Sequence, residues 1–158
     1  MSKTIGRMSE AEIRNRITEL AFDGDALRFR EFLKTLQAGL PAGTGIAFRG
    51  SVVTNERWED GEPFDSKGRG SSDLDVTLVG EQVMALWEEG FYIPALHTKP
   101  LSDEQPQIAP ALAPLRERLQ KLAGRPVNFQ ATANLILFAR DVLLGEPYVM
   151  LIQPGKSS

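Results

Sequence analysis

The sequence contains no cysteine and a single histidine among its 158 residues. Disulfides and thiolate metal sites are therefore excluded, and so is a metal site built from several histidines. No run approaches the roughly 18 consecutive apolar residues that a membrane-spanning helix needs. The opening residues also lack the apolar segment of a secretory signal peptide. These absences favour a cytoplasmic protein that does not enter membranes, with an exported effector as the alternative.

An excess of basic residues is also missing, because 18 Lys and Arg stand against 21 Asp and Glu, for a net charge of −3. This balance argues against a generally basic surface for nucleic acids and leaves room only for a local basic patch. The length fits one domain with a core that needs no disulfides. We expect a single domain over 1–158, with N-terminal helices at about 9–40 and the core of the fold at about 45–152.

Helical and strand patterns alternate along the chain. Apolar residues recur at helical spacing in several segments, and short apolar runs bounded by turn residues indicate strands between them. Helices are expected over 9–21, 25–40, 81–90, 109–124 and 133–145, and strands over 45–50, 73–79, 126–131 and 148–152. Ser9 and Thr132 are the expected N-caps of the first and last helices. The predicted class is α/β (α+β), a mixed β-sheet flanked by helices.

Two aspartates stand one residue apart in the strand expected over 73–79. Because strand side chains alternate, Asp73 and Asp75 share one face, opposite the apolar residues of the same strand. Carboxylates this close repel each other unless a cation lies between them, and Mg²⁺ is typically bound by one or two carboxylates together with substrate phosphates. An isolated Asp-x-Asp pair is more often a solvated strand face, so this pair alone does not identify a site.

A Gly-Ser turn follows the strand expected over 45–50. Gly50 allows close approach of the backbone to a ligand, and Ser51 adds a hydroxyl where a following helix would expose amides, which suits a triphosphate. An isolated Gly-Ser pair is an ordinary turn. The order of strand, Gly-Ser, polar connection and a strand with two acids favours a site for a metal-bound nucleotide.

Residues 45–80, with Gly50 and Ser51 followed by Asp73 and Asp75 in "SDLDV", resemble the nucleotidyltransferase superfamily that includes DNA polymerase beta. The closest likeness in style is to small stand-alone or toxin-associated members. The resemblance implies a nucleotidyltransferase fold, two Mg²⁺ ions, and transfer of a nucleoside monophosphate from an NTP such as ATP with release of pyrophosphate. It assigns Asp73 and Asp75 to the metal and Gly50 and Ser51 to the β- and γ-phosphates.

The connection between the turn and the acids is longer than is usual in that family. Within it, Lys67 and Arg69 are predicted to neutralise phosphate charge. Trp58 is either a stacking platform for a base or a loop anchor. Arg49 stands where many relatives have an apolar or aromatic residue, and it either points toward the phosphates or pairs with a nearby acid.

Besides the longer connection and Arg49, a third difference from that family lies in the strand expected over 126–131, where family enzymes often carry a third carboxylate. This sequence has Asn128 there, as a predicted metal ligand through its carbonyl oxygen. An amide adds no negative charge and cannot act as a general base. Asp65 is the candidate acid that would reach the site from the loop instead. His97 is expected to be a partly exposed loop residue, and Arg140 and Asp141 to lie on the outer face of the last helix.

The leading hypothesis is a minimal nucleotidyltransferase that transfers a nucleoside monophosphate to an acceptor hydroxyl on RNA or tRNA, on a protein, or on a small molecule. Asn128 favours one alternative, a degenerate module that binds a nucleotide without transferring anything. A further alternative is a toxin-type enzyme with a partner antitoxin. The small size leaves little room for an acceptor-binding domain, which suggests that a partner protein supplies one.

Overall fold

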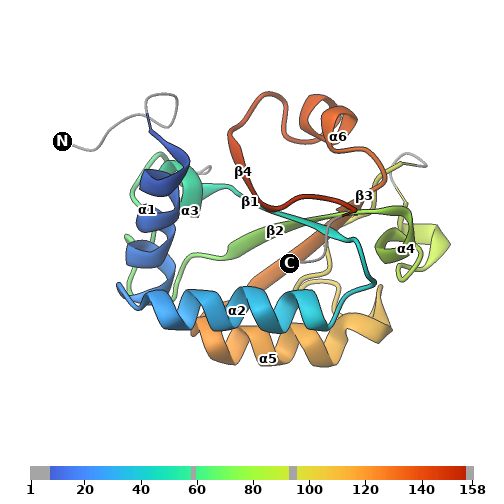
Figure 1. The fold of residues 1–158 in the computed structure, drawn as a ribbon, viewed down its shortest axis with the longest axis horizontal. Helices are drawn as coiled ribbons and strands as arrows, with labels where there is room; N and C mark the ends of the chain where they lie inside the picture. Colours follow the sequence, from blue (N-terminus) through green and yellow to red (C-terminus); the bar gives the residue numbers. More distant parts are fainter. Residues whose placement is uncertain (1–7, 58–59, 93–95, 156–158) are drawn as a thin grey trace.

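The computed structural model describes residues 8–57, 60–92 and 96–155. Its helices are α1 (Glu10–Phe22), α2 (Ala26–Ala38), α3 (Ser51–Thr54), α4 (Glu81–Met84), α5 (Ala113–Ala123) and α6 (Leu135–Asp141), with short 3₁₀ turns at Glu89–Phe91 and Pro110–Leu112 (Figure 1). Its strands are β1 (Gly45–Arg49), β2 (Leu74–Val79), β3 (Val127–Thr132) and β4 (Tyr148–Ile152). The expected elements are therefore present, although α4 is much shorter than the segment predicted over 81–90.

The four strands form one sheet in the order β3-β2-β1-β4. Strand β1 is antiparallel to both β2 and β4, whereas β2 and β3 are parallel. A parallel pair needs a crossover connection, and here the segment that contains α4 and α5 supplies it. The predicted class, a mixed sheet flanked by helices, is confirmed.

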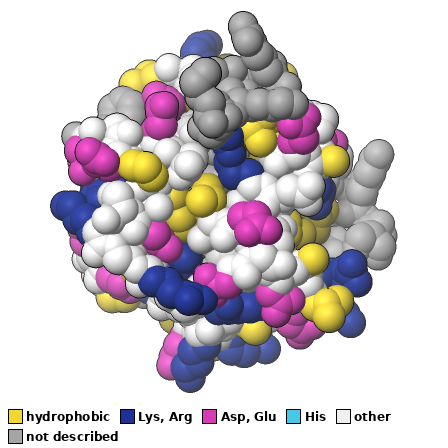
Figure 2. All heavy atoms as spheres, turned by 90° about the vertical axis from the view of Figure 1, so that its left-hand side faces the viewer, with side chains coloured by type: hydrophobic (Ala, Val, Ile, Leu, Met, Phe, Trp, Pro, Cys, Tyr) yellow, Lys and Arg dark blue, Asp and Glu magenta, His cyan; other side chains and the backbone are white. Residues whose placement is uncertain are grey.

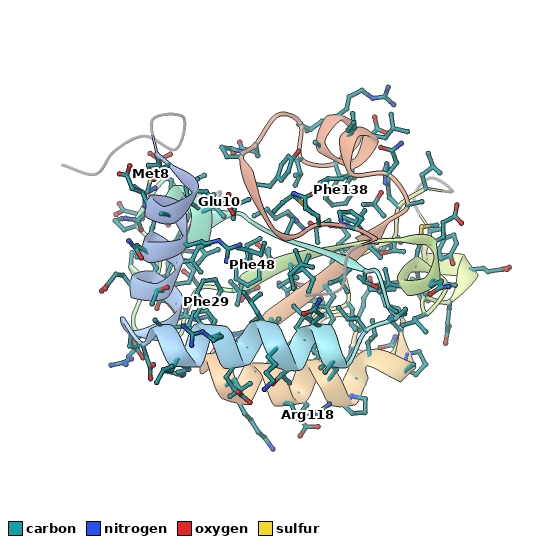
Figure 3. The ribbon with its side chains drawn as sticks, in the orientation of Figure 1. Met8, Glu10, Phe29, Phe48, Arg118 and Phe138 are labelled. Atoms are coloured by element: carbon teal, nitrogen blue, oxygen red, sulfur yellow. The ribbon has the colours of Figure 1, made fainter. Side chains whose placement is uncertain are left out.

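Opposite faces of the sheet are covered by different helices. Helices α2 and α5 lie side by side along one face, and α6 lies on the other side (Figure 1). Phe48 of β1 meets Phe29 and Phe32 of α2, with ring centroids 6.0 and 5.9 Å apart (Figure 3). Burial of each such ring stabilises the fold by roughly 1.5–3 kcal/mol. The apolar face of the sheet is thereby fixed against α2 and α5, which leaves its polar face toward α6.

The helix starts follow local capping chemistry. The Ser9 hydroxyl accepts from the Glu12 backbone N–H at 3.1 Å, and the Glu12 carboxylate accepts from the Ser9 backbone N–H, which is the predicted capping box. The prediction of Thr132 as the cap of the last helix is wrong. Asn134 caps α6, because its side chain accepts from the Leu137 N–H at 3.1 Å. Thr132 ends β3 and binds inward to neighbouring groups instead.

The surface has charges of both signs. Figure 2 shows Lys and Arg side chains interspersed with Asp and Glu over the face that carries α1. Within the described ranges, the chain forms no helix with the length and apolar character required to span a bilayer.

Candidate functional site

Three polar side chains meet at one end of the parallel pair β2–β3. The sheet register places Asp75 directly beside Asn128. The Asn128 side-chain nitrogen donates to Asp73 Oδ2 at 2.9 Å and to Asp75 Oδ1 at 3.1 Å. The expectation that Asn128 lies across the sheet from the two aspartates is confirmed. An N–H donor therefore lies between two carboxylates, at a position where a cation would be stabilised by both of them.

The backbone of the Gly-Ser turn closely approaches this acid pair. Gly50 has φ +79° and ψ −155°, which disfavours any residue with a side chain. A Cβ at Gly50 would lie 2.9 Å from Asp75 Oδ2. Ser51 begins α3, whose first amide groups have no partner within the helix. Gly50 and Ser51 therefore lie beside the acid pair, as the sequence predicted.

A pocket of about 410 Å³ opens in front of these groups. Its lining residues come from the turn after β1, the segment before β2, and the connection between α6 and β4: Arg49, Gly50, Ser51, Thr54, Glu56, Arg57, Ser71, Ser72, Asp73, Asp75, Val142, Leu143, Leu144 and Glu146. The lining combines these carboxylates and hydroxyls with the apolar side chains of Val142, Leu143 and Leu144, which form the apolar wall of the pocket. Such a site combines polar groups for an anionic or metal-bound moiety with apolar surface for an organic one.

Arg49 lies on the polar face of the sheet, directly across β1–β2 from Asp75. Its Nε donates to Thr77 Oγ1 at 3.2 Å and its Nη2 donates to Gln130 Oε1 at 2.8 Å. Burial lowers the pKa of Arg49 from its ordinary value, and the negative charge of Asp75 opposes that change. Because an arginine side chain is not deprotonated in proteins, the guanidinium remains charged at neutral pH. Arg49 therefore contributes a fixed positive charge beside the acid pair.

Asp65 does not reach the site, so the suggestion that it replaces the missing acid is wrong. Arg125 donates to both carboxylate oxygens of Asp65, at 2.7 and 2.9 Å. The backbone N–H groups of Gly70 and Ser72 also donate to Asp65, at 3.1 and 2.9 Å. Burial acts to raise the pKa of Asp65, but these hydrogen bonds and the charge of Arg125 lower it below its usual value. The role of Asp65 is to hold the segment that leads into Asp73.

The two cations predicted from the loop do not line the pocket. Arg69 instead pairs with Asp23, at the end of α1, and Lys67 is exposed. The lining includes Arg57, which the sequence interpretation missed. Its position shortly after α3 is the signal that could have identified it, because α3 begins at the Gly-Ser turn. Trp58 lies outside the described residues.

His97 is fully buried, contrary to the expectation of a partly exposed loop residue. Its Nδ1 lies 2.8 Å from Thr132 Oγ1 and its Nε2 lies 3.3 Å from Asp141 Oδ2. Arg140 is exposed as predicted, whereas Asp141 turns one oxygen toward this histidine. His97 therefore links Thr132, the last residue of β3, to Asp141, the last residue of α6, directly before the apolar wall of the pocket.

The donor set of the site fits one divalent cation. Two carboxylates converge on the Asn128 amide, which presents a carbonyl oxygen if it rotates by 180°, and Gly50 keeps the approach to Asp75 open. In the described part of the chain, no three His, Asp or Glu side chains form a cluster suited to a metal. The three-carboxylate cage typical of a two-ion site is therefore not found in this part of the structure.

Comparison of the chain with protein-family models, with curated proteins and with solved structures gives no match.

Proposed function

We propose that the protein is a Mg²⁺-dependent nucleotidyltransferase, which transfers a nucleoside monophosphate from an NTP to an acceptor hydroxyl and releases pyrophosphate. The observation that supports this proposal is the convergence of Gly50 and Ser51 with Asp73 and Asp75 on one pocket. Asn128 holds both aspartates by hydrogen bonds. Segments far apart in the sequence supply these groups, so the polar cluster is a product of the fold rather than of local sequence. The pocket volume is in the range typical of small-molecule sites.

Each group has a definite role in this proposal. Asp73 and Asp75 hold the cation that accompanies the triphosphate, and this cation would neutralise charge on the phosphate oxygens. The turn at Gly50 and Ser51 receives the β- and γ-phosphates, with the Ser51 hydroxyl as a donor. Arg57, on the same pocket wall, adds positive charge for the triphosphate. Val142 and Leu143 provide apolar surface for the nucleoside.

The transfer itself needs few further groups. The acceptor oxygen forms a bond with the α-phosphorus while the bond from that phosphorus to the pyrophosphate oxygen breaks. The hydroxyl proton passes to a carboxylate of the site or to water, because the amide of Asn128 cannot accept it. Positioning and charge stabilisation account for most of the catalysis in phosphoryl-transfer reactions of this kind.

A second candidate function is nucleotide binding without transfer. The observation that favours it is the amide at position 128, which holds both aspartates by hydrogen bonds but brings no third negative charge. In this case the protein retains a metal-bound nucleotide and acts through a partner. Both functions use the same pocket, and they differ only in whether the nucleoside monophosphate is transferred to an acceptor.

The acceptor proposed here is a hydroxyl on a protein, on a tRNA or other RNA, or on a small molecule, in a cytoplasmic setting. Glu56 and Glu146 are exposed members of the pocket lining. Because these acids repel a nucleic-acid backbone, they favour a protein or small-molecule acceptor. A toxin-type activity with a partner antitoxin is consistent with the same chemistry.

The test is incubation of the full chain with each α-labelled NTP, Mg²⁺ and a cell extract, followed by separation of RNA, protein and small molecules. Transfer predicts label in one fraction with the wild-type chain and none with Asp75→Asn. Tight nucleotide binding with no label in any fraction would favour the binding module. Absence of both binding and labelling would refute the proposed site.

A further inference from the structure

The polar face of the sheet has a fixed positive charge next to its acid pair. Arg49 and Asp75 are opposite each other in the β1–β2 register, so their side chains leave the sheet on the same face. The Arg49 side chain extends across the sheet, over Thr77 of β2 to Gln130 of β3. Its guanidinium therefore lies beside Thr77 and Gln130, the pair that follows Asp75 and Asn128 on this face of the sheet.

This cation is held rigidly. Gln130, which accepts from Arg49, is fixed in turn by donating to the Thr98 carbonyl at 2.8 Å. The guanidinium lies over the ring of Phe138, whose centroid is 5.8 Å from the Arg49 Cζ. Thr77 and Gln130 are themselves buried. Arg49 cannot leave this position without breaking two part-buried hydrogen bonds, which hold its charge beside the acid pair.

The net charge of the site suits one divalent cation. Asp73 and Asp75 provide two negative charges, Asn128 provides none, and Arg49 places one positive charge beside them. One divalent cation neutralises both carboxylates. A second divalent cation about 4 Å away would need further negative ligands to offset its repulsion from the first. Neither the amide nor the guanidinium supplies such a ligand.

We propose that Arg49 and Asn128 together take the place of a second divalent cation, so that this site holds one ion, the one that arrives with the triphosphate. Asn128 occupies the position of a third carboxylate and bridges Asp73 and Asp75 through its N–H groups. Arg49 supplies the positive charge that stabilises the acid pair from the sheet side. This inference rests on the proposed nucleotide site and differs from the two ions that the family resemblance implies.

Two substitutions separate the contributions of these residues. Asn128→Asp restores a third carboxylate and should create a second cation position. Arg49→Gln removes the positive charge but keeps a hydrogen-bonding side chain, and it should tighten the binding of Mn²⁺ alone because it removes the repulsion between the guanidinium and the ion. Matched controls are Ala42→Asp, which adds the same charge at an exposed position before β1, and Arg118→Gln on the exposed face of α5 (Figure 3).

The experiment counts Mn²⁺ bound to the full chain by electron paramagnetic resonance, with and without an equimolar NTP analogue that has a non-hydrolysable α–β bridge. Circular dichroism checks that every variant is folded. We expect one Mn²⁺ per nucleotide-bound chain for the wild type and both controls, and two for Asn128→Asp. Two ions in the wild type, or one in Asn128→Asp, would overturn the inference.

Calorimetric nucleotide binding distinguishes this inference from the proposed function. Two Mn²⁺ ions with intact nucleotide binding would refute only the single-ion inference. Absence of Mn²⁺ together with nucleotide binding that is unchanged in Asp75→Asn would refute both. An Arg49→Gln variant whose Mn²⁺ affinity equals that of Arg118→Gln would show that Arg49 does not act on the acid pair.

Discussion

Gly50 and Asp75 are so close that no side chain fits between them: a Cβ at Gly50 would lie 2.9 Å from the Oδ2 atom of Asp75. Gly50→Ala should therefore displace the Asp75 carboxylate and weaken Mg²⁺-dependent nucleotide binding at least tenfold. Gly50 has φ +79° and ψ −155°, a conformation essentially restricted to glycine, so the substitution adds a backbone cost of roughly 1–3 kcal/mol in stability. Calorimetry with Mg²⁺ and NTP measures the first effect, and urea unfolding measures the second.

Gly61→Ala is the matched control for this substitution. Gly61 also has a positive φ, of +71°, but a Cβ there would meet nothing within 4 Å. It should lose similar stability and keep its nucleotide affinity. Equal nucleotide affinities in the two variants would show that the contact with Asp75 is unimportant.

Removal of either aspartate should abolish Mg²⁺-dependent NTP binding without unfolding the chain. Asp73→Asn and Asp75→Asn each remove one of two neighbouring negative charges, which relieves repulsion in the metal-free protein and offsets the weakened hydrogen bond to Asn128. Calorimetry measures binding, and thermal unfolding measures stability. Glu117→Gln, an exposed change on α5, is the control and should behave as wild type. Unchanged affinity in both aspartate variants would eliminate the metal site.

The Asp65–Arg125 pair should make stability depend on pH in the acid range. The folded-state pKa of Asp65 is depressed, so its stabilising contribution is complete above the unfolded-state pKa of about 3.9 and is lost as the pH falls through the folded-state value. Asp65→Asn should cost about 3–5 kcal/mol at pH 7, because the Arg125 side chain, 2% exposed, is left without a counter-charge.

Urea unfolding of this variant at pH 7, 5 and 3 checks the prediction. Asp65→Asn should lose less free energy of unfolding between pH 5 and pH 3 than the wild type does. Glu117→Gln should retain the wild-type pH profile. Parallel profiles for the wild type and Asp65→Asn would contradict the assignment.

The buried His97 should be needed for the ordered wall of the pocket. His97→Leu removes the contacts to Thr132 and Asp141. Because the Thr132 hydroxyl keeps its hydrogen bonds to Leu96 and Asn134, the cost is about 0.5–1.5 kcal/mol for each hydrogen bond lost. Amide hydrogen exchange should accelerate across residues 135–144, and nucleotide affinity should fall. Arg140→Gln, which changes the exposed partner of Asp141, is the control. Unchanged exchange in α6 would show that His97 has no influence on the wall.

The parts of this structure that depend on local pattern could be predicted from the sequence. Alternation in "DLDVTLV" separates the buried Leu74, Val76 and Leu78 from the acids, and the structure has this arrangement. The position of Asn128 beside Asp73 and Asp75 was expected from the family resemblance, and the register of β2 with β3 places it there. The alternation within a strand follows from its two-residue period, whereas the register between two strands does not.

Predictions that depended on the choice of a partner were less successful. His97 is polar and lies outside the regular elements, which suggested exposure, but Thr132 and Asp141 satisfy both of its nitrogens in the interior. Asp65 lies in the connection between the Gly-Ser turn and Asp73, which suggested that it could reach the site. The buried Arg125 instead donates hydrogen bonds to both of its carboxylate oxygens. Such pairings are set by distances in the folded chain, which hydrophobic periodicity does not encode.

The parallel pairing of β2 with β3 has a kinetic consequence. Asp75 and Asn128 are separated by 53 residues along the chain, and their contact forms only after the crossover through α5 has closed. The hairpin-like pairing of β1 with β2 brings Gly50 to Asp75 over a much shorter separation. Because long-range contacts are slower to form than local ones, the turn and the acids should assemble first and Asn128 should arrive last. During refolding, the acid pair would therefore pass through a stage in which no amide bridges it.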